Sequence, residues 1–222
     1  MKKVIAVFIL LLAITTVSNA QSLIPFKPTL QVMVKGSYGV PTGHPDFKDN
    51  AKSFPGVQLE LAYDVSSTWG IYGNFSADFI DSKNSPIPNT TAATSKQYIG
   101  YVGPRYYILL PANPLMKLYA DAGVGIYNAS IGDVTANTGN ASLTNISSIT
   151  QTGVNLGFGG NFTAGTNMFI TAGIKYHYII KKDNETISAT LNNNGTSTTL
   201  SGTTNIPERS YIQFALGLGF KF

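Results

Sequence analysis

The sequence predicts an all-β fold, namely an eight-stranded antiparallel up-and-down transmembrane β-barrel. Apolar and polar residues alternate with a period of two in eight segments, and helical periodicity is absent after the N-terminal segment. The connections between the segments are alternately short and long, which is typical of such barrels. One face of the segments is apolar and ends in aromatic residues. The predicted strands are residues 29–40, 56–65, 69–80, 96–109, 116–128, 152–162, 167–180 and 208–222.

Residues 1–20 have the pattern of a signal peptide. Lys2 and Lys3 precede an apolar run, and the small residues Ser18, Asn19 and Ala20 form its exit. The run is shorter than the about 20 apolar residues that a membrane-spanning helix needs. We therefore expect the chain to be exported, with residues 21–222 forming a single outer-membrane β-barrel domain.

Composition excludes several classes of protein. The chain has no cysteine, so neither a disulfide framework nor a lipid-modified cysteine is available. Its formal charge of +4 includes the two signal-peptide lysines, and the remaining charges are few and dispersed. A basic surface for nucleic acid is therefore not expected.

The loops predict how the barrel sits in the membrane. Short turns ("VSST", "PANP" and "TAGT") alternate with long loops rich in Asn, Thr, Ser and Gly, and in outer-membrane barrels the turns are periplasmic and the loops face outward. In the last loop, Asn194-Gly195 lies between alternating stretches and is typical of a type I′ hairpin. We expect strands seven and eight to continue beyond the membrane as a β-hairpin, with a disordered loop as the alternative. The long loops are residues 41–55, 81–95, 129–151 and 181–207.

The apolar face of the predicted strands fits a bilayer. It carries aromatic residues at two levels, as expected for rings at the two membrane interfaces. Trp69 and Phe79 are ten residues apart on one segment, which corresponds to roughly 25 Å of height for a tilted strand. The predicted aromatic girdles are Tyr38, Tyr63, Trp69, Phe79, Tyr98, Tyr106, Phe162 and Tyr178.

The opposite face carries charged residues together with glycines that leave room for long side chains. An unpaired charge in such a lumen is costly, so we expect these charges to pair. They form either a structural plug or a salt-bridge gate that opens a narrow ion path. The predicted lumen charge network is Lys35, Glu60, Arg105, Lys117, Asp121 and Lys175. The interior glycines are Gly123, Gly125, Gly157, Gly159, Gly217 and Gly219.

A soluble, lipocalin-like barrel that binds an apolar ligand shows the same alternation with the faces exchanged. Alternation alone does not decide between the two. The two aromatic levels and the small interior residues favour the membrane, because a cavity for an apolar ligand would be lined by bulky apolar side chains. A closed sheet also satisfies every backbone donor within hydrocarbon.

Two stretches resemble known proteins. The terminal strand is similar to the C-terminal strand signal of bacterial outer-membrane proteins, which implies insertion by the barrel-assembly machinery. "YIGYVGPRYYI", residues 98–108, resembles the fourth strand of small OmpA-like, porin-family barrels of Gram-negative bacteria. Pro104 lies within this segment and lacks a backbone donor, so we expect a β-bulge there and a change of parity after it. The residues of the predicted C-terminal assembly signal are Phe214, Leu216, Leu218, Phe220 and Phe222.

The resemblance implies a monomer in the cell outer membrane, in contact with outer-membrane lipid and lipopolysaccharide. Its expected role is envelope integrity or surface interaction, with an extracellular ligand at the long loops.

Neither histidine predicts catalysis. Lipid A-modifying barrels are an alternative, and their deacylase type pairs a His with a nearby Ser. No Ser follows His177 in "KYHYIIKK", so we expect His177 to be a hydrogen-bonding lumen residue. His44 and Asp46 alone do not make a metal site, and we expect His44 to be a solvated loop residue. No catalytic, metal or cofactor-binding residue is therefore predicted.

Overall fold

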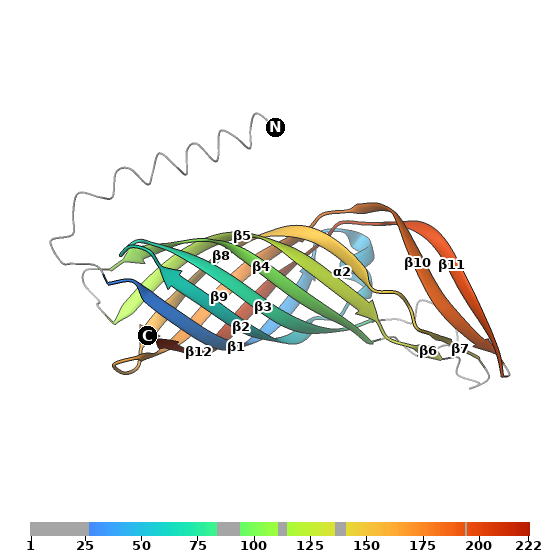
Figure 1. The fold of residues 1–222 in the computed structure, drawn as a ribbon, viewed down its shortest axis with the longest axis horizontal. Helices are drawn as coiled ribbons and strands as arrows, with labels where there is room; N and C mark the ends of the chain where they lie inside the picture. The colour runs from blue at the N-terminus through green and yellow to red at the C-terminus, as the bar shows by residue number, and fades with distance from the viewer. Residues whose placement is uncertain (1–26, 84–93, 111–114, 136–140, 194) are drawn as a thin grey trace, which may run out of the picture.

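The structure, a computed structural model, describes residues 27–83, 94–110, 115–135, 141–193 and 195–222. Side chains along its strands alternate between the two faces of the sheet, as the period of two in the sequence predicts. Eight strands close into an antiparallel barrel in the order β1-β12-β9-β8-β5-β4-β3-β2 (Figure 1). The predicted fold class is confirmed. The barrel strands are β1 (Thr29–Thr42), β2 (Phe54–Asp64), β3 (Trp69–Asp81), β4 (Thr94–Leu109), β5 (Met116–Ile131), β8 (Ile149–Thr163), β9 (Met168–Ile179) and β12 (Arg209–Lys221).

The connections between barrel strands differ at the two ends of the barrel. Short connections join β2 to β3, β4 to β5 and β8 to β9 at one end, which we call the turn end. The connections from β1 to β2, β3 to β4, β5 to β8 and β9 to β12 are long and lie at the opposite end, which we call the long-loop end. The predicted signal peptide, residues 1–20, and the turn at 111–114 lie outside the described residues.

A second sheet extends the long-loop end. Strands β10 (Lys182–Asn193) and β11 (Thr196–Ile206) form the hairpin predicted for the last loop, and Figure 1 shows it projecting beyond the barrel. Asn193 pairs with Thr196, and Gly195 has a φ of +83°. Asn194 lies outside the described residues, so the predicted turn type stays a prediction.

The pairing of this hairpin with another loop was not predicted. Strands β6 (Val134–Thr135) and β7 (Ala141–Thr144) complete a four-stranded sheet in the order β11-β10-β7-β6. The contact joins β7 in the third long loop to β10 in the fourth, from Ala141↔Asn193 to Thr144↔Thr190. Strands this short carry too few residues to show a period of two.

The first long loop contains a helix that hydrophobic periodicity did not predict. Helix α2 (Pro45–Asn50) has six residues, which is less than two turns, so an apolar stripe cannot develop. His44 caps its N-terminus, because its Nδ1 accepts a hydrogen bond from the backbone N–H of Asp46 at 3.3 Å. None of the helices within the described ranges is long and apolar enough to cross a bilayer.

The β-bulge predicted at Pro104 is wrong. Strand β4 keeps one register with β3 from Trp69↔Tyr106 to Asp81↔Thr94, and it keeps one register with β5 on both sides of the proline. Gly103 precedes the proline and lies so close to β5 that an added Cβ would overlap the carbonyl oxygen of Ala122. Because glycine permits this approach, β4 accommodates the missing donor without an extra residue, and the parity is unchanged.

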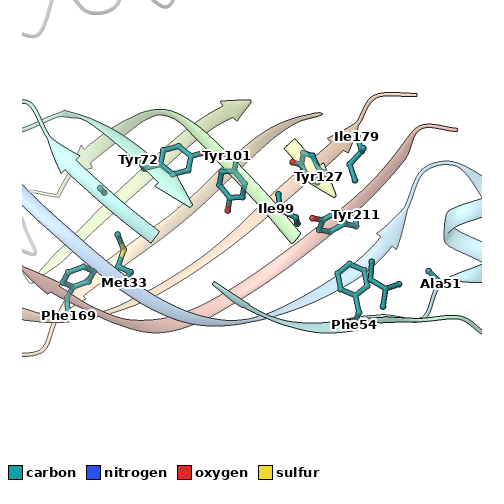
Figure 2. Packing of buried hydrophobic residues seen from close by; sticks show 12 residues of the cluster. Met33, Ala51, Phe54, Tyr72, Ile99, Tyr101, Tyr127, Phe169, Ile179 and Tyr211 are labelled. Atoms are coloured by element: carbon teal, nitrogen blue, oxygen red, sulfur yellow. The ribbon is translucent and has the colours of Figure 1, made fainter. Parts of the chain in front are cut away.

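The two faces of the barrel differ in polarity, as the sequence predicts. Large apolar side chains such as Leu59, Phe75 and Leu216 are exposed on the outer wall, whereas the lumen holds buried polar, charged and aromatic side chains. Figure 2 shows the aromatic and apolar part of this filling, with Met33 and Phe169 near one end and Phe54 and Tyr211 toward the other. The outer wall is therefore the apolar surface and the lumen the polar interior.

Gly103→Ala tests the close approach of β4 and β5. The new methyl group would overlap backbone atoms of β5, so we expect a loss of about 1–3 kcal/mol in the free energy of unfolding. Gly36→Ala is the control, because a Cβ at that outward-facing position meets nothing within 4 Å. Urea unfolding in lipid vesicles measures both, and equal stabilities would contradict the close approach.

Candidate functional site

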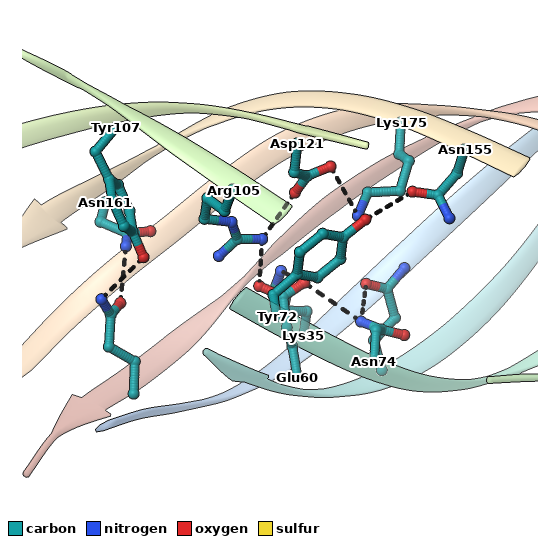
Figure 3. A network of polar contacts seen from close by, with 12 residues as sticks. Lys35, Glu60, Tyr72, Asn74, Arg105, Tyr107, Asp121, Asn155, Asn161 and Lys175 are labelled. Atoms are coloured by element: carbon teal, nitrogen blue, oxygen red, sulfur yellow. Dashed lines mark hydrogen bonds and ion pairs between the residues drawn. The ribbon is translucent and has the colours of Figure 1, made fainter. Parts of the chain in front are cut away.

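Five charged side chains meet in the middle of the lumen, and we call Lys35, Glu60, Arg105, Asp121 and Lys175 the central cluster (Figure 3). They come from β1, β2, β4, β5 and β9, so residues far apart in the sequence meet across the barrel. Glu60 binds Lys35 and Arg105, each at 2.7 Å. Asp121 binds Arg105 at 2.8 Å and Lys175 at 3.1 Å.

Arg105 joins the two halves of the central cluster. Its Nη2 atom donates to Glu60 Oε1 and to Asp121 Oδ2, and the side chain is fully buried. The guanidinium lies over the ring of Tyr119 at 4.0 Å and that of Tyr72 at 4.8 Å. Aromatic faces attract a cation that has lost water. The tyrosine rings therefore stabilise a cluster in which two carboxylates are shared among three cations.

Tyrosine rings also contact the side chain of Lys175. Its Nζ atom lies 4.4 Å from the ring centre of Tyr72 and 4.6 Å from that of Tyr101. The Tyr72 hydroxyl donates to Asn155 Oδ1 at 2.8 Å, which fixes the ring between Arg105 and Lys175. The sequence prediction of the network did not include these tyrosines. Their parity on the strands could have found them, because each lies on the lumen face of its strand.

Lys117 belongs to a separate layer near the turn end. Its Nζ binds Asp64 at 3.1 Å and lies 3.5 Å from the ring centre of Tyr107. Gln31 donates to both oxygens of Asp64 and to the Tyr107 hydroxyl, and it accepts from Asn161. The structure therefore brings five of the six predicted charges together, and pairs the sixth with an aspartate that the predicted network omitted.

A third layer lies toward the long-loop end and contains His177. Its ring hydrogen-bonds to the Tyr127 hydroxyl at 2.9 Å and to Gln213 at 3.1 Å, and it stacks on Tyr211 with ring centres 4.5 Å apart. Gln213 also donates to Asp78 at 3.0 Å. Every polar atom of the imidazole is thus satisfied by lumen residues.

Described residues of these layers line one small cavity. A cavity of about 20 Å³ lies beside Lys35, Gln58, Lys175 and Gln213. Such a volume holds about one water molecule. The interior glycines allow close packing, since an added Cβ at Gly157 would overlap the carboxylate of Asp121, and one at Gly217 would overlap the backbone oxygen of Val34 and crowd Lys35. Larger residues at these positions would leave no room for the central cluster.

The outer wall carries the other predicted sets. Among the girdle residues, Tyr38, Tyr63, Phe79, Tyr98, Phe162 and Tyr178 are exposed, while Trp69 and Tyr106 are half-buried and pack together with ring centres 5.0 Å apart. All five residues of the predicted assembly signal are exposed at β12 and its end.

No metal site emerges from the described part of the chain, in which no three His, Cys, Asp or Glu side chains gather. His44 and Asp46 lie 3.5 Å apart at the start of α2, outside the barrel lumen.

Comparison with protein families matches residues 7–222 to the outer membrane protein beta-barrel domain. The chain belongs to this family of outer-membrane β-barrels. Its place is therefore the cell outer membrane, as predicted. The soluble lipocalin-like alternative is excluded, because the apolar wall of an outer-membrane barrel faces lipid.

Solved structures share the fold at low sequence identity. The chain is similar to a major outer membrane protein from Thermus thermophilus, with 12% identity and a TM-score of 0.60 over 89% of this chain and 100% of that one. OprG from Pseudomonas aeruginosa has 13% identity and a TM-score of 0.53, covering 87% and 95%. Neisserial surface protein A has 13% identity and a TM-score of 0.52, covering 88% and 97%. No curated protein matches the chain.

Asp121→Asn tests how far the outer-membrane barrel depends on its central cluster. The substitution removes a charge that Arg105 and Lys175 share in a buried site, so we expect unfolding to become easier by about 3–5 kcal/mol. The matched control is Asp183→Asn, which breaks an exposed pair with Lys181 and should cost less than about 1 kcal/mol. Urea unfolding in vesicles gives both values, and similar losses would refute a special role for the cluster.

Proposed function

We propose that the protein is a non-enzymatic outer-membrane scaffold whose lumen is plugged by the central cluster, leaving at most a narrow gated pore. The observation that supports this most is the position of Arg105, whose Nη2 bridges Glu60 and Asp121 across the lumen. A path for solute would have to pass this bridge. The cavity beside Lys35 and Lys175, the other two cations of the central cluster, has a volume of about 20 Å³, which is too small for a hydrated ion.

A plug is favoured over a gate by the number of contacts that opening would break. Both oxygens of Glu60 and both oxygens of Asp121 contact a cation. Moving Arg105 aside would leave one oxygen of each carboxylate without its cation. Removing one partner from a buried pair costs about 3–5 kcal/mol, so open states should be rare.

The absence of enzymatic activity is part of the proposal. A lipid A-modifying enzyme would need an activated nucleophile, and the partners of His177 are Tyr127, Gln213 and the ring of Tyr211. None of these is a Ser or Cys that the imidazole could deprotonate. Its buried, stacked position also keeps it from a lipid on the outer wall.

The second sheet supports a role in surface interaction. Within the described ranges β11 pairs only with β10, and residues 196–205 are exposed. Its sequence "TSTTLSGTTNI" has no charge and no proline, which are the usual devices that prevent another strand from pairing with an edge. We propose that an extracellular ligand of the long loops adds an extended segment to this edge.

The exposed apolar residues of the outer wall suggest two further partners, the membrane lipids and the barrel-assembly machinery. We propose that the barrel is a monomer surrounded by outer-membrane lipid and lipopolysaccharide, with its exposed apolar face in the hydrocarbon. The exposed apolar residues of β12, from Phe214 to Phe222, are proposed to be read by the barrel-assembly machinery during insertion.

Planar-bilayer recording tests the plug. We expect the refolded mature protein to show no steady openings, and Arg105→Ala and Glu60→Ala to show discrete ones, because each removes a side chain that crosses the lumen. Lys181→Ala is the control and should be silent, because Lys181 is exposed beyond the barrel. Frequent openings of the unmodified protein would contradict the plug and favour a pore.

A further inference from the structure

The outer wall has a groove that the plugged lumen does not explain. It lies over β3, β4, β5 and β8, has an open volume of about 700 Å³, and is lined by Val102, Val124 and Val154. Gly73 and Gly100 form part of its floor. A Cβ at Gly100 would meet nothing within 4 Å, and one at Gly73 would find its nearest neighbour at 3.9 Å. The wall is hollow here because two outward positions lack side chains.

The groove reaches the long-loop end of the barrel. A second hollow of about 340 Å³ shares Ile126, Thr152 and Ile180 with the first and extends to Lys182. The two form one channel along the outer surface, apolar at mid-barrel and basic at its upper end. In outer-membrane barrels this end faces outward, so the channel runs along the outer leaflet.

Lys182 lines the upper end of the groove, and Lys96 lies on β4 beyond Gly100, above the groove lining. Lys96 has the same parity as Tyr98 and Gly100 and therefore points outward just above the girdle. It is exposed and forms no ion pair, although all eleven Asp and Glu residues of the chain lie in the described ranges. Lys182 begins β10, which continues the chain from β9, and β4 and β9 are separated by β5 and β8. The backbones of Lys96 and Lys182 are therefore three strand spacings apart along the wall, ~14 Å.

Lys182 is oriented toward the groove. Its Nζ donates to the carbonyl oxygen of Thr150, a groove residue, at 3.1 Å, and it pairs with Glu185 at 2.8 Å. One of its three donors remains for another acceptor. Its neighbour Lys181 also lines the second hollow and pairs with Asp183 at 3.2 Å.

We propose that this groove holds an acyl chain of one lipopolysaccharide molecule, with the phosphates of its lipid A at Lys96 and Lys182. The proposal deepens the lipid contact proposed above and rests on it. Charge complementarity identifies the occupant, because an acyl chain fits an apolar channel and a phosphate accepts charge-assisted hydrogen bonds from lysine. A lipid with two separated phosphates can bind both lysines, whereas a phospholipid with one phosphate cannot.

The site can be tested by extracting the full-length mature protein from outer membranes in mild detergent and identifying the lipid that stays bound to it. Native mass spectrometry should find lipopolysaccharide on the wild type. Gly100→Leu fills the groove, and the double variant Lys96→Gln, Lys182→Gln removes both cations, so each should lower retention about tenfold. Two controls should retain as much as the wild type. Gly36→Leu fills an open outward position on β1, at the other side of the barrel, and Lys52→Gln removes an exposed lysine that lines neither hollow.

Three results would overturn the site: equal retention by Gly100→Leu and Gly36→Leu, unchanged retention by the double lysine variant, or retention of phospholipid in place of lipopolysaccharide. Refolding the wild type into phosphatidylcholine vesicles that contain diphosphoryl or monophosphoryl lipid A gives an independent result. Thermal stabilisation should be larger with the diphosphoryl form, and equal stabilisation would contradict a two-lysine site. Because conductance does not enter either experiment, failure of the site is distinguishable from failure of the plug.

Discussion

The rest of the structure depends on the bridge that Arg105 makes between Glu60 and Asp121. A closed barrel in hydrocarbon satisfies its backbone through the ladder between neighbouring strands, but its lumen must be filled as well. Glu60 comes from β2, Asp121 from β5 and Arg105 from β4, so the bridge links β2 to β5, which the ladder does not join directly. Charge pairing here also determines where the glycines must be, because large side chains opposite need space.

The lumen is organised as layers around this bridge. A polar layer with Lys117 and Asp64 lies toward the turn end, and a layer of rings and amides around His177 lies toward the long-loop end. Tyrosine rings connect the layers, since Tyr72 and Tyr101 contact Lys175 and Tyr101 also packs against His177. A buried charge without such contacts would be costly. The outer wall is simple by comparison, and its groove over β3, β4, β5 and β8 is due to Gly73 and Gly100.

Most of the barrel could be predicted because the period of two assigns each strand residue to the outer wall or to the lumen. Inward positions such as Lys35, Asn155 and Gln213 follow from parity alone, and Trp69 and Phe79 gave the height of the strands. Parity does not say which charges pair, so Lys117 was grouped with charges from another layer. Local sequence signals did not predict features that depend on tertiary contacts. Pro104 fits its strand without a bulge because Gly103 approaches β5, and β7 forms because it pairs with β10.

The most direct test of the central claim is the coupling energy between Glu60 and Arg105. Urea unfolding in vesicles of Glu60→Gln, Arg105→Met and the double variant forms a double-mutant cycle. If the buried pair holds the lumen together, the sum of the two single losses should exceed the loss of the double variant by about 2–3 kcal/mol. Losses that add within about 0.5 kcal/mol would mean that the two charges lie close without stabilising the barrel, and the account would fail.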